Sequence, residues 1–144
     1  MSNRKNDNNP YSKFSNKDYD FVSNKTNYNK TIISDFFNLI LLGEISKLDS
    51  FLFNYPYLNK SLNSEEDSPY HVVVESNLSN HKKINLIKYL KSKDFNINVQ
   101  NKMGDTPLLI ASKQFNIDVI DVLINSNADI NISNYLNINP IHYI

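Results

Sequence analysis

The chain has 144 residues, which leaves room for one domain, and its 15 Lys and Arg residues balance its 15 Asp and Glu residues. Nucleic-acid binding needs a basic surface, and a chain with zero net charge and a single arginine, Arg4, does not provide one. The absence of cysteine excludes disulfides, thiol catalysis and most structural zinc sites.

The first thirty residues differ in composition from the rest of the chain. Residues 1–30 are rich in Asn, Ser, Lys and Asp and follow neither a helical nor an alternating pattern. Such a segment buries too little apolar surface to offset the entropy of ordering it, so we predict a disordered tail. Its aromatic residues leave two interpretations open, a docking motif or a plain tail: Tyr11, Phe14, Tyr19 and Phe21.

No segment of the sequence has the pattern of a signal peptide or a membrane span. The N-terminus is polar, and the longest apolar stretch, residues 36–42, is far shorter than a membrane-spanning helix. We therefore expect no membrane partner and an intracellular protein, cytoplasmic in the first place. The nucleus, or a host cell into which the protein is delivered, stays open as its compartment.

Two short apolar segments follow the tail. Residues 36–44 and 48–52 predict two helices, and Gly43 lies near the end of the first segment. Further along, aliphatic residues recur with helical spacing at residues 86–90 and again at residues 119–124. The apolar part of the chain is therefore expected to be all-α.

A short motif with proline recurs three times along the chain. Ser68-Pro69-Tyr70-His71 is followed by Gly104-Asp105-Thr106-Pro107-Leu108-Leu109 and then by Asn137-Ile138-Asn139-Pro140-Ile141-His142. The prolines are 38 and then 33 residues apart. A period in this range is typical of stacked repeats. The alignment places the five surplus residues of the first step between two helices, around residues 77–81, as a longer turn, because lengthening a loop costs little entropy.

The residues of the motif suit a turn that enters a helix. Thr106 is a good N-cap, and Pro107 fits the next position, where the missing N–H is not needed. Gly104 suits a backbone position with positive φ, and Asn137 in the equivalent place is the next most tolerant residue.

From residue 33 to residue 144 the chain resembles the ankyrin repeat family, most closely over residues 96–142. The resemblance implies an all-α solenoid of helix-turn-helix units after the disordered tail. The expected units are an N-terminal one at 33–67, two at 68–105 and 106–138, and an incomplete one at 139–144. Because the last unit opens a helix without finishing it, we expect a longer array, a truncated gene product, or completion by another chain.

We find no catalytic constellation in the sequence. The resemblance implies that His71 and His142 hydrogen-bond the backbone of the adjoining loop, and His81 is expected in the long turn, facing solvent. The acidic run 65–67 and the lysines of residues 82–93 are interpreted as solvated surface. We therefore expect no enzyme, no metal, no cofactor and no small-molecule substrate.

The resemblance implies a protein-protein interaction module that binds an unidentified protein partner through turn tips and the concave helix face. The residues carried over are Lys102, Met103, Asp105, Lys113, Gln114, Tyr135, Leu136 and Ile138, and in the preceding unit Ser64, Glu65, Asp67, Glu75 and Ser76.

Two alternatives remain open. Tyr135, Leu136 and Ile138 either anchor a partner or pack onto a neighbouring turn. The chain is either a protein-binding module in its own right or the N-terminal targeting or regulatory segment of a longer ankyrin protein, effector or enzyme. We expect a monomer unless another chain covers the open C-terminal end.

Overall fold

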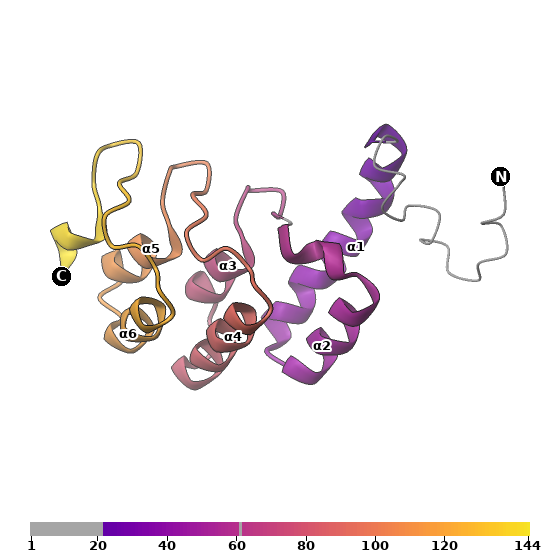
Figure 1. The fold of residues 1–144 in the computed structure, drawn as a ribbon, viewed down its shortest axis with the longest axis horizontal. Helices are drawn as coiled ribbons and strands as arrows, with labels where there is room; N and C mark the ends of the chain where they lie inside the picture. Colours follow the sequence, from indigo (N-terminus) through magenta and orange to yellow (C-terminus); the bar gives the residue numbers. More distant parts are fainter. Residues whose placement is uncertain (1–21, 61) are drawn as a thin grey trace, which may run out of the picture.

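The computed structural model describes residues 22–60 and 62–144 (Figure 1). Within these residues the chain is helical and has no strand, which confirms the all-α prediction. The elements are α1 (Val22–Leu42), α2 (Ile45–Asn54), the 3-10 helix η4 (Pro56–Lys60), α3 (Pro69–Glu75), α4 (Asn80–Ser92), α5 (Pro107–Lys113), α6 (Ile117–Asn125) and the 3-10 helix η5 (Pro140–Tyr143).

The helices stack in consecutive pairs. The first helices of successive pairs lie side by side, as do the second helices of the last two pairs, so α3 contacts both α1 and α5 while α4 contacts α6. Figure 1 shows the pairs in a row, with the loops that enter α3, α5 and η5 rising on the same side. The two apolar segments that predicted helices lie in α1 and α2, and Gly43 between them has a φ of 73°.

A continuous apolar core runs between the stacked pairs. Phe36 and Tyr70 are fully buried, and the ring of Phe36 stacks on that of Phe95 with centroids 5.9 Å apart. The hydroxyl of Tyr70 donates to the carbonyl oxygen of Phe95 at 3.3 Å, so its one polar group has a partner. Because each pair buries its side chains against its neighbours, the array depends on stacking for its stability.

Helix α1 is longer than the sequence predicts. It begins at Val22, so it includes residues 22–30 of the segment that we expected to be disordered. Extending an existing helix adds a hydrogen bond for each residue fixed, whereas starting one is unfavourable, so a packed helix can continue into polar sequence. The rest of the predicted tail, with its four aromatic residues, lies outside the described residues.

The surplus of five residues lies mostly in a helix, and our prediction of a longer turn was wrong. Helix α4 has 13 residues and its counterpart α6 has 9. The linker before α4 is only one residue longer than the linker before α6. Ser79 caps the additional first turn, because its hydroxyl accepts the N–H of Lys82 at 3.3 Å.

This additional turn also changes the interpretation of two side chains. Lys83 was expected on a solvated face but is buried, with 7% of its surface exposed, and its Nζ donates to the carbonyl oxygen of Val74 at 2.9 Å. Burial lowers the pKa of Lys83. His81 is exposed, as expected, but it lies in the first turn of α4 rather than in a loop.

Candidate protein-interaction surface

Three turns along the array are built on one plan. The side-chain Oδ1 atoms of Asn63, Asn101 and Asn134 each accept hydrogen bonds from the backbone N–H groups two and four residues later, at 2.8 to 3.1 Å. An asparagine side chain that satisfies its own turn in this way fixes the loop without any neighbour. The turns 63–67, 101–105 and 134–138 therefore share one backbone shape.

The same asparagines connect each turn to the one before it. Nδ2 of Asn101 donates to Asp67 Oδ1 at 3.2 Å, and Nδ2 of Asn134 donates to Asp105 Oδ1 at 2.9 Å. Asp67 and Asp105 are each the fourth residue after the asparagine of their turn. In the last turn the fourth residue is Ile138, which has no carboxylate to accept such a hydrogen bond. These hydrogen bonds between successive turns were not predicted from the sequence, although the asparagines repeat with the same steps of 38 and 33 residues as the prolines.

Each turn contains a residue with positive φ at its third position after the asparagine. Gly104 has a φ of 82° and Asn137 a φ of 63°, as predicted, and Glu66 at the equivalent place has a φ of 65°. A Cβ on Gly104 would lie 2.7 Å from the backbone nitrogen of Tyr135. Glycine is therefore needed at this position both for its backbone conformation and for the close approach of the next turn.

Asp105 was expected at a turn tip but lies inside the surface, with 8% of its area exposed. Its carboxylate accepts Asn134 Nδ2 on one oxygen and forms an ion pair with Lys113 Nζ at 3.1 Å on the other. Its backbone N–H donates to Asn101. With both oxygens occupied within the chain, Asp105 stabilises the turns and is not an accessible contact residue.

His71 has the role that the sequence predicts. Its Nδ1 accepts the backbone N–H of Ser68 at 3.0 Å, so its Nε2 carries the proton and donates to the carbonyl oxygen of Asp105 at 2.8 Å. His142 does not extend to an adjoining loop: among the described residues it hydrogen-bonds only Asn139. Leu109 occupies the position of His71 in the next unit and is fully buried.

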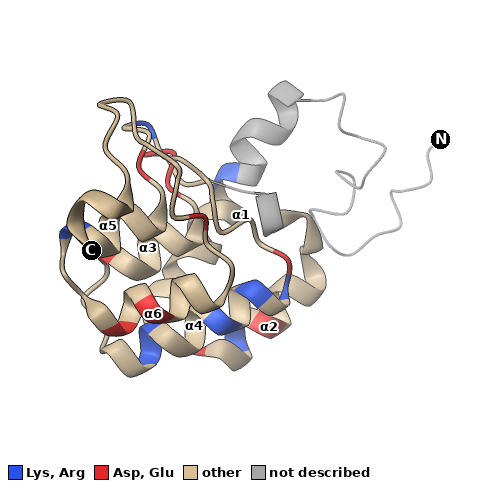
Figure 2. Ribbon diagram, turned by 60° about the vertical axis from the view of Figure 1, so that its left-hand side comes forward, with Lys and Arg blue, Asp and Glu red and all other residues tan. Residues whose placement is uncertain are grey.

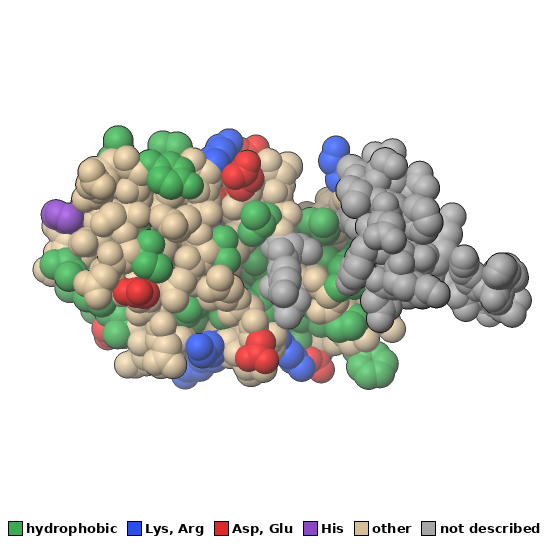
Figure 3. Space-filling view, turned by 45° about the horizontal axis from the view of Figure 1, so that its top comes forward, with side chains coloured by type: hydrophobic (Ala, Val, Ile, Leu, Met, Phe, Trp, Pro, Cys, Tyr) green, Lys and Arg blue, Asp and Glu red, His purple; other side chains and the backbone are tan. Residues whose placement is uncertain are grey.

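The exposed side chains of the turns change in character along the array. Glu65 and Lys102 form an ion pair between the first and second turns. Met103 is 59% exposed, Tyr135 70% and Leu136 72%. Figure 3 looks onto these turns and shows hydrophobic side chains beside the basic and acidic ones. We call the exposed residues of the three turns the tip surface: Ser64, Glu65, Glu66, Lys102, Met103, Tyr135 and Leu136.

The three apolar residues of the last turn differ in exposure. Leu136 points away from the chain, whereas Ile138 is half-buried. Tyr135 contacts Gly104 of the neighbouring turn with one edge of its ring and exposes the rest. Leu136 and most of Tyr135 are therefore available to a partner.

The predicted helix positions lie at the ends of α3 and α5. Lys113 and Gln114 are exposed, but the ammonium of Lys113 is paired with Asp105. Glu75 is exposed, and Ser76 donates its hydroxyl hydrogen bond to the carbonyl oxygen of Val73. Burial, followed by the negative charges of Asp67 and Asp105, raises the pKa of Glu75.

Charge is distributed unevenly over the surface. Figure 2 shows several basic residues on α4, while acidic residues lie in the turns above α3 and on α6. Among the described residues, Glu66 and Glu75 form no ion pair. Glu65, Glu66, Asp67 and Glu75 therefore outnumber the one lysine beside the first turn, Lys102, and leave this region with a net negative charge.

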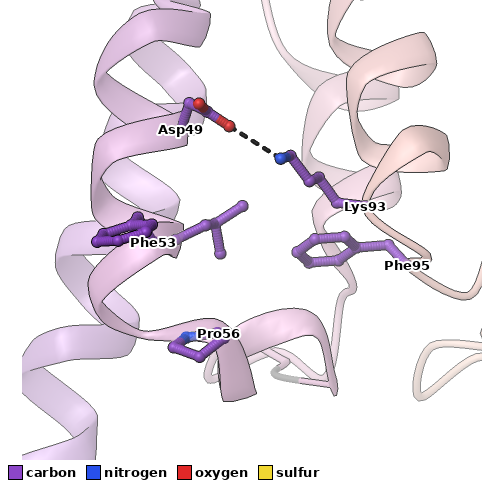
Figure 4. A pocket seen from close by; sticks show the side chains of 6 residues that line it. Asp49, Phe53, Pro56, Lys93 and Phe95 are labelled. Atoms are coloured by element: carbon purple, nitrogen blue, oxygen red, sulfur yellow. Dashed lines mark ion pairs between the residues drawn. The ribbon is translucent and has the colours of Figure 1, made fainter.

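Two hollows occur away from the second and third turns. One, of about 260 Å³, lies between α2 and the segment after α4, with the Asp49–Lys93 ion pair at 3.0 Å on its rim (Figure 4). Phe53 beside it is 86% exposed. The other, of about 390 Å³, lies between α1 and residues 62–64. Both are open and shallow and contain no cluster of reactive groups.

The residues at 22–60 and 62–144 include no group of three or more His, Cys, Asp or Glu side chains that could bind a metal ion. None of the helices in this part of the chain has the length and apolar character to cross a membrane.

The sequence was compared with known proteins. A family model described as ankyrin repeats, in three copies, matches residues 38–134. No curated protein matches the chain. The matched residues cover about two thirds of the sequence and include the first two turns and the helices from α2 to α6. The chain therefore belongs to the ankyrin repeat family.

Proposed function

We propose that this chain is a non-catalytic module that binds another polypeptide through its tip surface. Ankyrin repeats are generally protein-interaction modules. The observation that carries the proposal is the exposure of three large apolar side chains on two adjacent turns, Met103, Tyr135 and Leu136. Neighbouring exposed apolar groups are typical of interaction sites, and aromatic residues supply much of the binding energy at interfaces.

The rigidity of the turns supports the same function. Each tip side chain stands on a loop whose backbone is fixed by an asparagine, and Tyr135 is further supported by Gly104. A surface that is ordered before binding loses less conformational entropy when a partner arrives. Lys113 and Gln114 at the end of α5 border this surface and are proposed as secondary contacts. Ile138, which is half-buried in the same turn as Leu136, is proposed as a further secondary contact.

Selection of peptides from a random display library tests the proposal. Peptides selected on the wild-type chain are measured against the double variant Tyr135→Ala/Leu136→Ala. We expect at least a tenfold weaker Kd, because truncating two central apolar anchors removes about 1.4 kcal/mol or more of binding free energy.

The control is Phe53→Ala, which removes a similarly exposed aromatic side chain on α2, away from the turns. It is expected to leave the affinity unchanged. If the selected peptides bind the double variant as tightly as the wild type, or lose binding to Phe53→Ala instead, the tip surface is not the binding site.

A further inference from the structure

The three turns present equivalent positions with different chemistry. Two residues after the asparagine the side chains are Glu65, Met103 and Leu136, and the positive-φ position of the first turn adds Glu66. The tip surface is thus acidic at one end and apolar at the other. Because the backbone of the turns is the same, this gradient belongs to the side chains alone.

The acidic end of the tip surface is only partly neutralised from within the chain, because the charge of Lys102 is shared among Glu65, Glu66 and Asp67. Lys102 pairs with Glu65, but among the described residues neither Glu66 nor Glu75 has a cationic partner. Asp67 adds a further carboxylate, which accepts a hydrogen bond from the neutral amide of Asn101. Burial, followed by the negative charges of Asp67 and Asp105, raises the pKa of Glu75, so a further carboxylate lies within electrostatic reach of Asp67. A positively charged group from a partner would relieve the repulsion between these carboxylates.

The distance between the two ends follows from the stacking. Packed helices lie about 8 to 10 Å apart, so the first and third turns are separated by about 16 to 20 Å. An extended peptide rises about 3.3 Å per residue, which makes this distance equal to five or six residues.

We propose that the tip surface binds an extended polypeptide segment that contains a Lys or Arg and a large apolar residue. These two residues are five or six positions apart, in either order. The basic residue lies against Glu66 and Glu75, and the apolar residue packs on Met103, Tyr135 and Leu136. This inference rests on the proposed function and adds the chemistry and spacing of the partner.

Synthetic twelve-residue peptides test the spacing. Each contains one Arg and one Leu, separated by one to nine residues of alternating Ser and Ala, and binding to the full chain is measured by fluorescence anisotropy at low salt. We expect the tightest binding when the Leu is five or six positions from the Arg. Removing either residue is expected to weaken it at least tenfold.

The variant Glu66→Gln/Glu75→Gln tests the charge. It keeps the shape of both side chains, and we expect about three- to tenfold weaker binding of the best peptide and a smaller salt dependence. The matched control is Asp35→Asn/Asp121→Asn, which makes the same change of charge on α1 and α6. It is expected to leave binding unchanged.

The outcomes separate the two proposals. If Tyr135→Ala/Leu136→Ala weakens binding but the glutamate variant does not, or if affinity is independent of spacing, the inference is overturned and the proposed function stands. If no tip variant affects binding, both fail. Sedimentation velocity tests whether the chain binds a second copy of itself. If the wild type self-associates and Leu136→Ala does not, a second copy covers the tip surface, and the inference is overturned.

Discussion

The turns 101–105 and 134–138 have the same backbone but are attached to the array in different ways. The first receives His71 from the preceding unit and links to Asp67 on one side and to Asn134 on the other. In the second, Leu109 replaces the histidine and Ile138 replaces the aspartate. The shape of a turn is therefore set by its asparagine and its positive-φ residue, whereas the histidine and the aspartate set how firmly the turn is held.

The largest effect is expected when this difference is removed by His71→Leu. Leucine is the residue that the next unit has at the equivalent position, 109. The substitution leaves the N–H of Ser68 without its partner, and it leaves the carbonyl oxygen of Asp105 with only the N–H of Asn101. We expect the free energy of unfolding to fall by about 2 to 3 kcal/mol, measured by urea denaturation. His142→Leu, at an exposed position, is the control and should change it by less than about 0.5 kcal/mol. Equal effects would contradict the role assigned to His71.

Gly104→Ala is expected to have the next largest effect. Alanine at this position has to adopt an unfavourable positive φ, and its Cβ meets the backbone of Tyr135. We therefore expect the free energy of unfolding to fall by about 2 kcal/mol. Asn137→Ala places alanine at the equivalent φ in the last turn and serves as the comparison. We expect Asn137→Ala to lower the free energy of unfolding by about 1 kcal/mol. Thermal denaturation of both variants measures the difference between them. If the two cost the same, the contact with Tyr135 contributes nothing.

The stability of the array should depend on pH through His71. Burial lowers the pKa of its imidazole below the ordinary value of 6.5, although hydrogen bonding to Asp105 partly opposes this. Above pH 6.5 the ring is neutral in both states and stability is fully present. As the pH falls below 6.5 the unfolded chain binds the proton first, so stability is lost until the folded-state pKa is reached. Urea denaturation between pH 7.5 and 5 should show this loss in the wild type, and a reduced slope in His71→Leu.

The smallest expected effect concerns the first turn. Glu66 has positive φ without being glycine or asparagine, unlike its counterparts in the other two turns. Glu66→Gly should raise the free energy of unfolding by about 0.5 kcal/mol, since relief of the backbone strain exceeds the added entropy of the unfolded chain. Glu65→Gly, which is next to it and has no such strain, should lower it. A stabilising Glu65→Gly would show that charge, rather than backbone conformation, dominates in this turn.

The stacked fold could be predicted from the sequence because its signals are local. Thr106 and Pro107 begin α5 as expected, and the hydroxyl of Thr106 accepts the N–H of Leu109 at 3.1 Å. The additional turn of α4 was missed because both a loop and a helix can absorb extra residues. Ser79, a good N-cap before Asn80, was the signal that favoured the helix.

The tip surface was only partly predictable. Met103, Tyr135 and Leu136 follow from their register in the repeat and are exposed as the register indicates. Asp105 has the same kind of position but is buried, because its neighbours Lys113 and Asn134 come from other parts of the chain. Contacts between units cannot be inferred from one unit alone. In a chain so rich in asparagine, the periodic ones were also difficult to distinguish from the rest.

The asparagine-based turns have a consequence for how such a protein changes over generations. The residue two positions after each asparagine donates its backbone N–H to that asparagine, and the side chains at this position and the one before it are exposed. Mutations there can alter what is recognised with little penalty for folding. A few substitutions in each unit could therefore change the binding specificity of the protein. The same positions are suitable for randomisation in a synthetic binding library.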